Sequence, residues 1–278
     1  MTSIFHFYKD LFDKKDLFEH IIKLEDFSFN SDLLSCINKG VFPDLAIRLN
    51  KDKSIFTGGE LIKLKDSDYY LVSSFNSTIP TAKKSIDRII KGESSHVKQQ
   101  MELAGDDIYS MPERNVFYLV RGRNKKKSSQ KIVLVDGSFF ETIGTNDLIS
   151  RSFSQVLNER LKESGKEITP ELELLLTEMF SEQENFSKVR SVDKASVKLR
   201  FRIMTEVKAE GNILNETKYP EIKDNTLNLI LPYHTEDNKE EAQKKMNIVF
   251  TKEDLNKMTE IKLKHHFNGY FIVYQTSL

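Results

Sequence analysis

The stretch FPDLAIRLNKDKSIFTGGELIKLKDS, residues 42–67, contains two alternating apolar runs separated by a turn. Side chains alternate between the two faces of a strand, so the apolar residues of the first run would share one face and Asp44 would lie on the other. A second strand is predicted from about Glu60 to Lys65, after the glycine pair. Lys65 would lie on the face opposite the apolar row of that strand. The sequence therefore predicts two neighbouring strands that present a carboxylate and an ammonium on their polar faces.

The segments around these strands indicate an α/β fold with a mixed β-sheet core flanked by helices. Residues 1–40, which include LFEHIIKLEDF and DLLSCI, are predicted to be helical from the spacing of their apolar residues. NVFYLVRG at 115–122 and KIVLVDGSFFET at 131–142 are predicted strands. Further helices are predicted at about residues 82–103, 146–164 and 170–181.

Strands predominate after about residue 190. SVKLRFRIMTEV alternates, TLNLILPY, NIVF and GYFIVYQT are predicted to follow as strands, and TKEDLNKM starts a short helix at Thr251 with Asp254 available for a capping box. We therefore expect an α/β core with N-terminal helices over residues 1–188 and a strand-rich C-terminal extension or subdomain over residues 189–278. The pattern leaves open whether this second part is a separate domain or extends the same sheet.

The composition is that of a folded globular protein, with 38% hydrophobic and 30% charged residues among 278. No stretch approaches the roughly 20 apolar residues that cross a bilayer, so no membrane partner is expected. Cys36 is the only cysteine, which excludes an intrachain disulfide and favours a reducing compartment. We therefore expect a cytoplasmic protein.

Charge is segregated along the chain although the formal net charge is zero. RGRNKKKSSQK at 121–131 holds six basic residues and no acid, whereas ITPELELLLTEMFSEQENF at 168–186 is acidic and apolar. A protein with a basic cleft and an acidic exterior can have no net charge and still bind nucleic acid.

The polar ends of the two strands contain the residue types of a metal-dependent phosphodiesterase. Mg²⁺ prefers oxygen ligands, commonly one or two carboxylates together with water and phosphate oxygens. A lysine two residues after a second acid points to the same side of the strand. Its ammonium could then orient the attacking water and offset the charge that develops on phosphorus.

The stretch resembles the PD-(D/E)xK nuclease motif, and residues 40–140 resemble type II restriction endonucleases. Asp44 falls on the first acid of the motif and Lys65 on its lysine. The resemblance implies a restriction-endonuclease-like core and Mg²⁺-dependent hydrolysis of DNA phosphodiester bonds at a short duplex site. It also implies a homodimer that matches a palindromic site. Asp44 and the backbone carbonyl of Leu64 would hold the metal, and Lys65 would position the water.

The chain departs from the motif at its second acid, because position 63 is Lys63. Three interpretations remain open. Glu60 could serve as the catalytic and metal-binding acid if a bulge near Gly58 and Gly59 re-aims it. The chain could be a natural inactive or divergent member. Lys63 could instead be a deliberate replacement of a glutamate, so that DNA is bound without being cleaved.

Two other functional classes also remain open: a non-catalytic DNA-binding protein with a degenerate nuclease fold, and an α/β protein unrelated to DNA whose charges are solvated. If DNA is the ligand, contacts to phosphates and bases are expected from the polar loop and basic helix that follow the second strand, and from the basic run at 121–131. The candidates are Ser73, Ser74, Asn76, Ser77, Thr78, Lys83, Lys84, Arg88, Arg121, Arg123, Lys125, Lys126 and Lys127.

Overall fold

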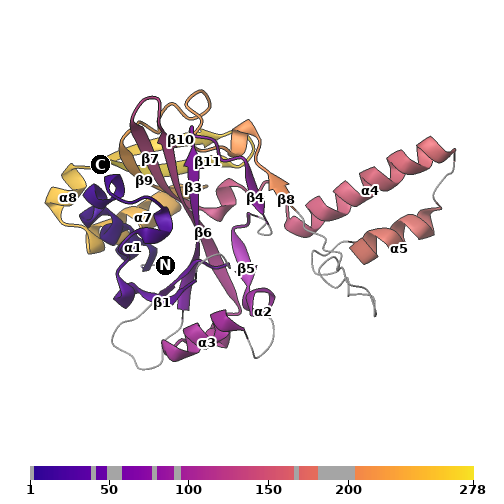
Figure 1. Cartoon of the computed structure of the whole chain (residues 1–278), viewed down its shortest axis with the longest axis horizontal. Helices are drawn as coiled ribbons and strands as arrows, with labels where there is room; N and C mark the ends of the chain where they lie inside the picture. The colour runs from indigo at the N-terminus through magenta and orange to yellow at the C-terminus, as the bar shows by residue number, and fades with distance from the viewer. Residues whose placement is uncertain are drawn as a thin grey trace. The chain divides into compact units, whose positions relative to one another are not determined.

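In a computed structural model the chain forms two compact units (Figure 1). The structure describes residues 3–38, 42–48, 58–76, 80–90, 95–165, 169–180 and 204–278. The first unit comprises residues 1–73, 82–140 and 207–278, and the second comprises residues 74–81 and 141–206. The candidate site lies in the first unit.

A large mixed β-sheet forms the first unit, as the sequence predicts. In the described residues its strands follow the order β1-β2-β3-β6-β7-β9-β11-β10, with β5 paired to β6 beside this path. β3 pairs with β6 and β7 pairs with β9 in parallel, while the other neighbours are antiparallel. The bounds are β1 Leu34–Ile37, β2 Leu45–Arg48, β3 Gly58–Asp68, β5 Lys83–Ser85, β6 Glu113–Asn124, β7 Ser129–Asp136, β9 Thr226–Tyr233, β10 Thr259–His265 and β11 Gly269–Ser277.

The strands near the C-terminus continue the same sheet. β9 lies between β7 and β11, and six of its eight residues are buried, which agrees with the nearly continuous apolar run TLNLILPY. The predicted boundary between residues 188 and 189, and most of the alternating segment before Met204, lie outside the described residues. The prediction that NIVF forms a strand is wrong, because Asn247 to Val249 are the last residues of helix α7, Glu236–Val249.

Helices cover one face of this sheet and bury the main core. Helix α1, Ser3–Asp13, contributes Phe5, Tyr8 and Leu11, and α7 contributes Met246. These side chains pack against the row of β2, β3 and β6 that includes Ile62. Figure 1 shows α1, α7 and α8, Lys252–Asn256, together on one side of the strands. Each fully buried side chain of this kind contributes about 2 kcal/mol to folding.

Local signals were reliable at some helices and misleading at others. The capping box between Thr251 and Asp254 is present at α8 as predicted. The prediction of a helical DLLSCI is wrong, since LSCI forms β1 and pairs with β2. The segment before it contains the 3₁₀ turns η1 Lys15–Glu19, η2 Leu24–Asp26 and η3 Ser31–Leu33, and the predicted helix at 82–103 divides into β5, α2 Ile86–Ile89 and α3 His96–Leu103.

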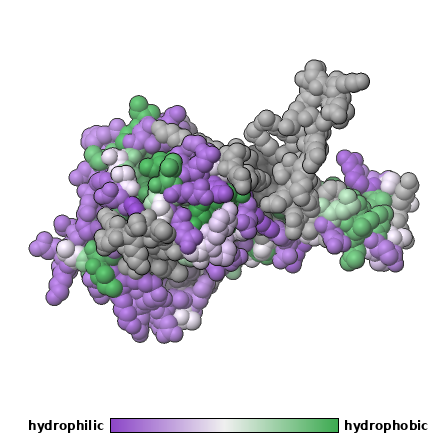
Figure 2. Space-filling model, turned by 90° about the horizontal axis from the view of Figure 1, so that it is seen from below, coloured by the Kyte–Doolittle hydropathy of each residue, from purple (hydrophilic) through white to green (hydrophobic). Residues whose placement is uncertain are grey.

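The second unit contains a helical hairpin and a small sheet. Helices α4, Thr145–Ser164, and α5, Pro170–Phe180, match their predicted ranges, and β4, Ser74–Asn76, pairs with β8, Met204–Glu206. Figure 2 shows hydrophobic side chains on the surface of the hairpin, and those exposed on α5 are Leu172, Leu174, Leu175 and Met179.

None of the helices in the described part of the chain has the length and apolar composition needed to cross a bilayer.

A buried ion pair explains the glycine at the start of β3. Arg114 and Asp106 have no exposed side-chain surface, and Arg114 Nη1 lies 2.8 Å from Asp106 Oδ2. The backbone N–H of Gly58 donates to Asp106 Oδ1 at 2.6 Å. A Cβ atom at Gly58 would lie 1.8 Å from Arg114 Nη1. Close approach to this ion pair therefore requires glycine at position 58.

We predict that Gly58→Ala lowers the free energy of unfolding by about 3 kcal/mol, because the added methyl group forces a buried ion pair apart. Urea denaturation followed by circular dichroism measures this loss. Gly144→Ala is the matched control, since its Cβ would meet Asp147 Oδ2 at an ordinary 3.4 Å. Equal stability of the two variants would contradict the assignment.

His265 is buried in an aromatic cluster that disfavours its protonation. Its ring lies 4.6 Å from that of Phe139, and its Nδ1 accepts hydrogen bonds from the backbone N–H groups of Phe267 and Asn268 at 3.1 and 3.0 Å. Burial lowers the pKa of His265 below its usual value. A proton on Nδ1 would abolish both hydrogen bonds.

We predict that stability falls as the pH drops below about 6.5, the usual pKa of an unfolded histidine, because the unfolded chain then binds a proton that folded His265 resists. Urea denaturation between neutral pH and mildly acidic pH measures the effect. His265→Asn should show a weaker dependence over the same interval. An equal pH dependence of stability in both proteins would contradict the assignment of this effect to His265.

Candidate functional site

Asp44 lies immediately before β2 and is directly opposite Lys63 of β3. Leu45 pairs with Ile62 in the antiparallel register, and the backbone N–H of Asp44 donates to the carbonyl of Ile62 at 3.1 Å. Lys63 Nζ lies 3.0 Å from Asp44 Oδ1 and 2.9 Å from Oδ2. The backbone N–H of Leu64 donates to Oδ2 at 2.7 Å. Both carboxylate oxygens of Asp44 are therefore already occupied by donors from β3.

Burial dominates the electrostatics of Asp44. The residue is 2% exposed, whereas the side chain of Lys63 is 22% exposed. Burial raises the pKa of Asp44, and the nearby Lys63 ammonium and the Leu64 N–H lower it without cancelling that effect. The ion pair thus makes a buried carboxylate tolerable, and loss of Lys63 alone would leave that carboxylate uncompensated.

Lys65 shares a face of β3 with Lys63. Ile62 and Leu64 belong to the core covered by α1, so the alternation of the strand turns Lys63 and Lys65 to the opposite face. The pKa of Lys65 is lowered, first by burial and second by the charge of Lys63. The prediction that Lys65 lies opposite the apolar row is confirmed. We call Asp44, Lys63 and Lys65 the Asp44 site.

Glu60 is not part of the Asp44 site. The pairing of β2 with β3 shifts between Ala46, opposite Leu61, and Arg48, opposite Gly58, so a bulge is present where the sequence suggests one. Glu60 nevertheless points to the face covered by α1, where it is 3% exposed and accepts a hydrogen bond from the hydroxyl of Ser3. The bulge therefore does not bring Glu60 to Asp44, and its predicted catalytic and metal-binding role is not supported by this geometry.

The residues present do not fit Mg²⁺. The N–H and C=O of one strand residue point to the same edge, so Leu64, whose N–H reaches Asp44, also turns its carbonyl toward that side. Asp44 is, however, a single carboxylate with an ammonium on both oxygens. Within the described residues, no group of three or more His, Cys, Asp or Glu side chains could hold a metal ion. A divalent cation would have to displace Lys63.

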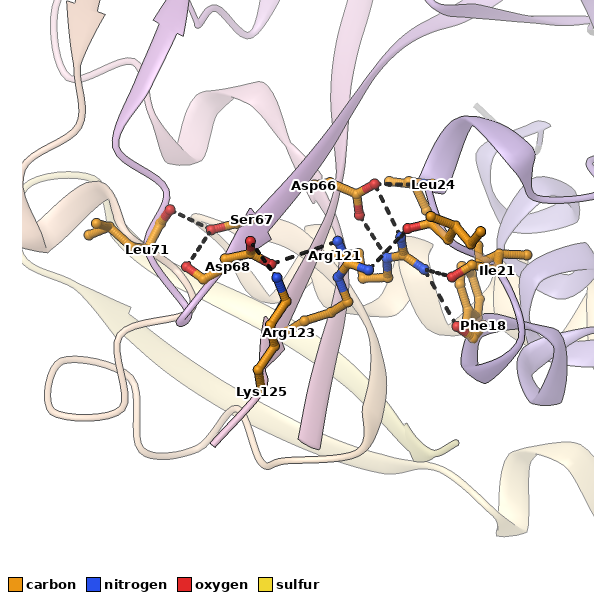
Figure 3. A network of polar contacts seen from close by, with 11 residues as sticks. Phe18, Ile21, Leu24, Asp66, Ser67, Asp68, Leu71, Arg121, Arg123 and Lys125 are labelled. Carbon is orange, nitrogen blue, oxygen red and sulfur yellow. Dashed lines mark hydrogen bonds and ion pairs between the residues drawn. The ribbon is translucent and has the colours of Figure 1, made fainter. Parts of the chain in front are cut away.

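Arg121 is a structural residue, which contradicts the prediction that it contacts a DNA phosphate. Its side chain is fully buried, and its guanidinium forms a fork with Asp66 at 2.7 and 3.1 Å. The remaining N–H groups donate to backbone carbonyls, as Figure 3 shows in part; these acceptors are Phe18, Ile21 and Ile22. Arg121 therefore ties the N-terminal 3₁₀ segment to β6.

Most of the other predicted basic contacts from this run have acidic neighbours. Lys125 Nζ lies 3.1 Å and Arg123 Nη2 lies 3.7 Å from the carboxylate of Asp68 (Figure 3). Lys127 Nζ lies 2.8 Å from Glu216. Lys126 is exposed. These pairings reduce the positive charge that the sequence run suggests.

The polar loop and the basic segment after β3 are only partly described. Ser73 is exposed, Ser74 and Asn76 lie in β4, and Ser77 and Thr78 are outside the described residues. Lys83 is exposed in β5, Arg88 is exposed in α2, and Lys84 is half-buried. Lys84 Nζ lies 5.3 Å from the ring centre of Phe42, at cation–π distance. Lys84 is thus held near the turn that leads into Asp44.

Sequence reasoning missed the acidic partners and Phe42. Asp66 and Asp68 follow Lys65 at alternate positions in LKDSD, and that spacing is the signal that could have revealed partners for a neighbouring basic strand. Nothing in the sequence indicates that Phe42 meets Lys84, because that contact depends on tertiary packing.

Comparison with protein-family models, with curated proteins and with solved structures finds no match for the chain. Side-chain geometry is therefore the basis on which a function can be argued.

We predict that Arg121→Lys lowers the free energy of unfolding by about 3 kcal/mol, because lysine cannot reproduce the fork to Asp66 and the carbonyl contacts. Urea denaturation measures the loss. Lys126→Ala, in the same basic run but exposed, should change stability by less than about 0.5 kcal/mol. An Arg121→Lys variant of unchanged stability that binds duplex DNA more weakly would restore the phosphate-contact role.

Proposed function

We propose that this chain is a type II restriction endonuclease of the PD-(D/E)xK kind in which Lys63 occupies the place of the second acid. As it stands, the chain binds a short duplex DNA site without cutting it. The observation that supports this most directly is the Asp44 site: Asp44 and Lys63 meet from adjacent strands, and Lys65 follows on the same face of β3.

The geometry also supports a metal site that Lys63 leaves incomplete. A glutamate at position 63 would add a carboxylate beside Asp44, with the Leu64 carbonyl turned to the same edge. Such an oxygen set is what Mg²⁺ prefers, and Mg²⁺ would supply the activation of water and the stabilisation of charge on the phosphate. Lys63 replaces that carboxylate with a cation. A cation at this position attracts phosphate and repels a metal ion.

The remaining parts of the proposal concern fold, assembly and location. The sheet flanked by helices would be a restriction-endonuclease-like core, and β9 to β11 would be its C-terminal extension. Exposed apolar side chains on α5 are consistent with a protein partner, and a homodimer would match a two-fold DNA site. Cys36 is buried and forms no disulfide, which fits a reducing compartment such as the cytoplasm.

A non-catalytic DNA-binding protein with a degenerate nuclease fold is the alternative. The position of Glu60 on the α1 face favours it, because the carboxylate of Glu60 then does not share a metal ion with Asp44. The two functions differ in whether one substitution at position 63 creates cleavage.

We predict that Lys63→Glu raises Mg²⁺-dependent cleavage of plasmid DNA by at least about 100-fold over the parent chain, because the new carboxylate completes a site for the ion. Conversion of supercoiled plasmid to linear DNA on agarose gels measures this gain. Lys63→Gln is the matched control, since it removes the ammonium without adding a carboxylate, and it should not cut.

Three outcomes separate the functional classes. Cleavage by Lys63→Glu that is lost on adding Asp44→Asn supports the endonuclease. Folded Lys63→Glu that binds duplex DNA with a steep salt dependence but never cuts supports the non-catalytic alternative. Absence of both binding and cleavage in parent and variant contradicts a role in DNA chemistry.

A further inference from the structure

The Asp44 site already has the formal charge that a metal-loaded site would have. Asp44 supplies one negative charge, and Lys63 and Lys65 each supply one positive charge, so these three residues together have one net positive charge, while Glu25 is a further acid whose charge acts on Asp44. With glutamate at position 63, the same three positions would have one net negative charge. A bound divalent cation would return that value to one net positive charge.

The Lys63 ammonium also lies where a metal ion bound to Asp44 would lie. It lies within hydrogen-bond distance of both Asp44 oxygens, at 3.0 and 2.9 Å, where a cation shared with Asp44 would sit. Its side chain is 22% exposed, whereas that of Asp44 is 3% exposed, so Lys63 is the more solvent-accessible partner of the pair. An ammonium is a compact point charge that attracts phosphate oxygens, but it has no open coordination position with which to activate water.

We propose that Lys63 makes phosphate binding at the Asp44 site independent of divalent metal ions, because its ammonium takes both the place and the net charge of the ion. This inference rests on the proposed function and concerns the cation requirement of the same site. A carboxylate pair would repel a DNA phosphate until it bound a metal ion. The Asp44–Lys63 pair has no such requirement.

The role of Asp44 changes accordingly. In this chain Asp44 is the counter-ion of Lys63 and not a metal ligand, so its carboxylate opposes phosphate binding. Asp44→Asn would keep an acceptor for the Leu64 N–H and raise the net charge of the site by one. That substitution should tighten duplex binding about threefold or more, whereas it should weaken binding in the Lys63→Glu background, where Asp44 would hold the ion.

The first experiment measures metal binding without DNA. Mn²⁺ is titrated into the full chain, into Asp44→Asn, into Lys63→Glu and into Lys63→Glu/Asp44→Asn, and free Mn²⁺ is followed by electron paramagnetic resonance. We expect no bound ion at this site in the parent chain, one additional ion in Lys63→Glu and loss of that ion in the double variant. Circular dichroism confirms that each protein is folded.

The second experiment measures affinity for duplex DNA. The probe is a fluorescein-labelled pool of about 30 base pairs with a randomised centre, and anisotropy is recorded in EDTA and in Ca²⁺ at equal ionic strength. The parent chain should bind equally in both, within about twofold, while Lys63→Glu should bind at least about tenfold more tightly in Ca²⁺.

The outcomes distinguish this inference from the proposed function. One Mn²⁺ ion bound to the parent chain and lost in Asp44→Asn would overturn the inference, as would a tenfold gain of parent affinity in Ca²⁺, even if Lys63→Glu cuts DNA. Failure of Lys63→Glu to cut, with metal-independent binding by the parent, would remove the endonuclease and leave the inference standing. Absence of duplex binding by every variant would overturn both.

Discussion

The parallel pairing of β3 with β6 is the constraint on which the candidate site depends. It aligns Leu61 to Asp68 with Val116 to Arg123 without interruption, so the two faces of β3 are fixed by those of a central, buried strand. Apolar side chains of β3 are held against the α1 layer, and the lysines must occupy the other face. A slip of one residue would exchange the two sets. Burial of apolar surface, and not attraction between charges, therefore determines where Lys63 and Lys65 lie.

The Asp44–Lys63 pair follows from that arrangement. A carboxylate that is 2% exposed needs a cation or several donors nearby, and the directly opposite position on β3 is the closest source. Because burial still raises the pKa of Asp44, the pair does not fully offset the cost of desolvation. A site in this condition favours any cation at position 63 or beside it. Either a metal ion or an ammonium can therefore neutralise the buried carboxylate of Asp44. Of the two, the metal ion can also activate a water molecule.

The parts of the fold that could be predicted from sequence are those decided locally. Strands β6 and β7, helices α4 and α5 and the Thr251 capping box depend on periodicity and nearest neighbours. DLLSCI was mispredicted because a run this short fits both helix and strand, and its pairing with β2 decides the outcome. The face of β3 on which Glu60 lies could be predicted from the sequence. Its hydrogen-bond partner could not, since Ser3 lies 57 positions away along the chain.

Arg121 shows why a basic run does not by itself indicate a basic surface. In NVFYLVRGR the residues at 117, 119 and 121 share the face that packs against the α1 layer, so alternation places Arg121 on that face. The register of β3 on β6 then sets Asp66 opposite Arg121 and Asp68 opposite Arg123. Beyond a Debye length of about 10 Å such pairs are nearly neutral to a phosphate. In the Asp44 site, Lys63 pairs with Asp44 across two strands, Lys65 lies on the same face of β3, and Glu25 is a further acid whose charge acts on Asp44. The partners that a cation meets across the strands, and not its neighbours in sequence, therefore decide how strongly it can attract a phosphate.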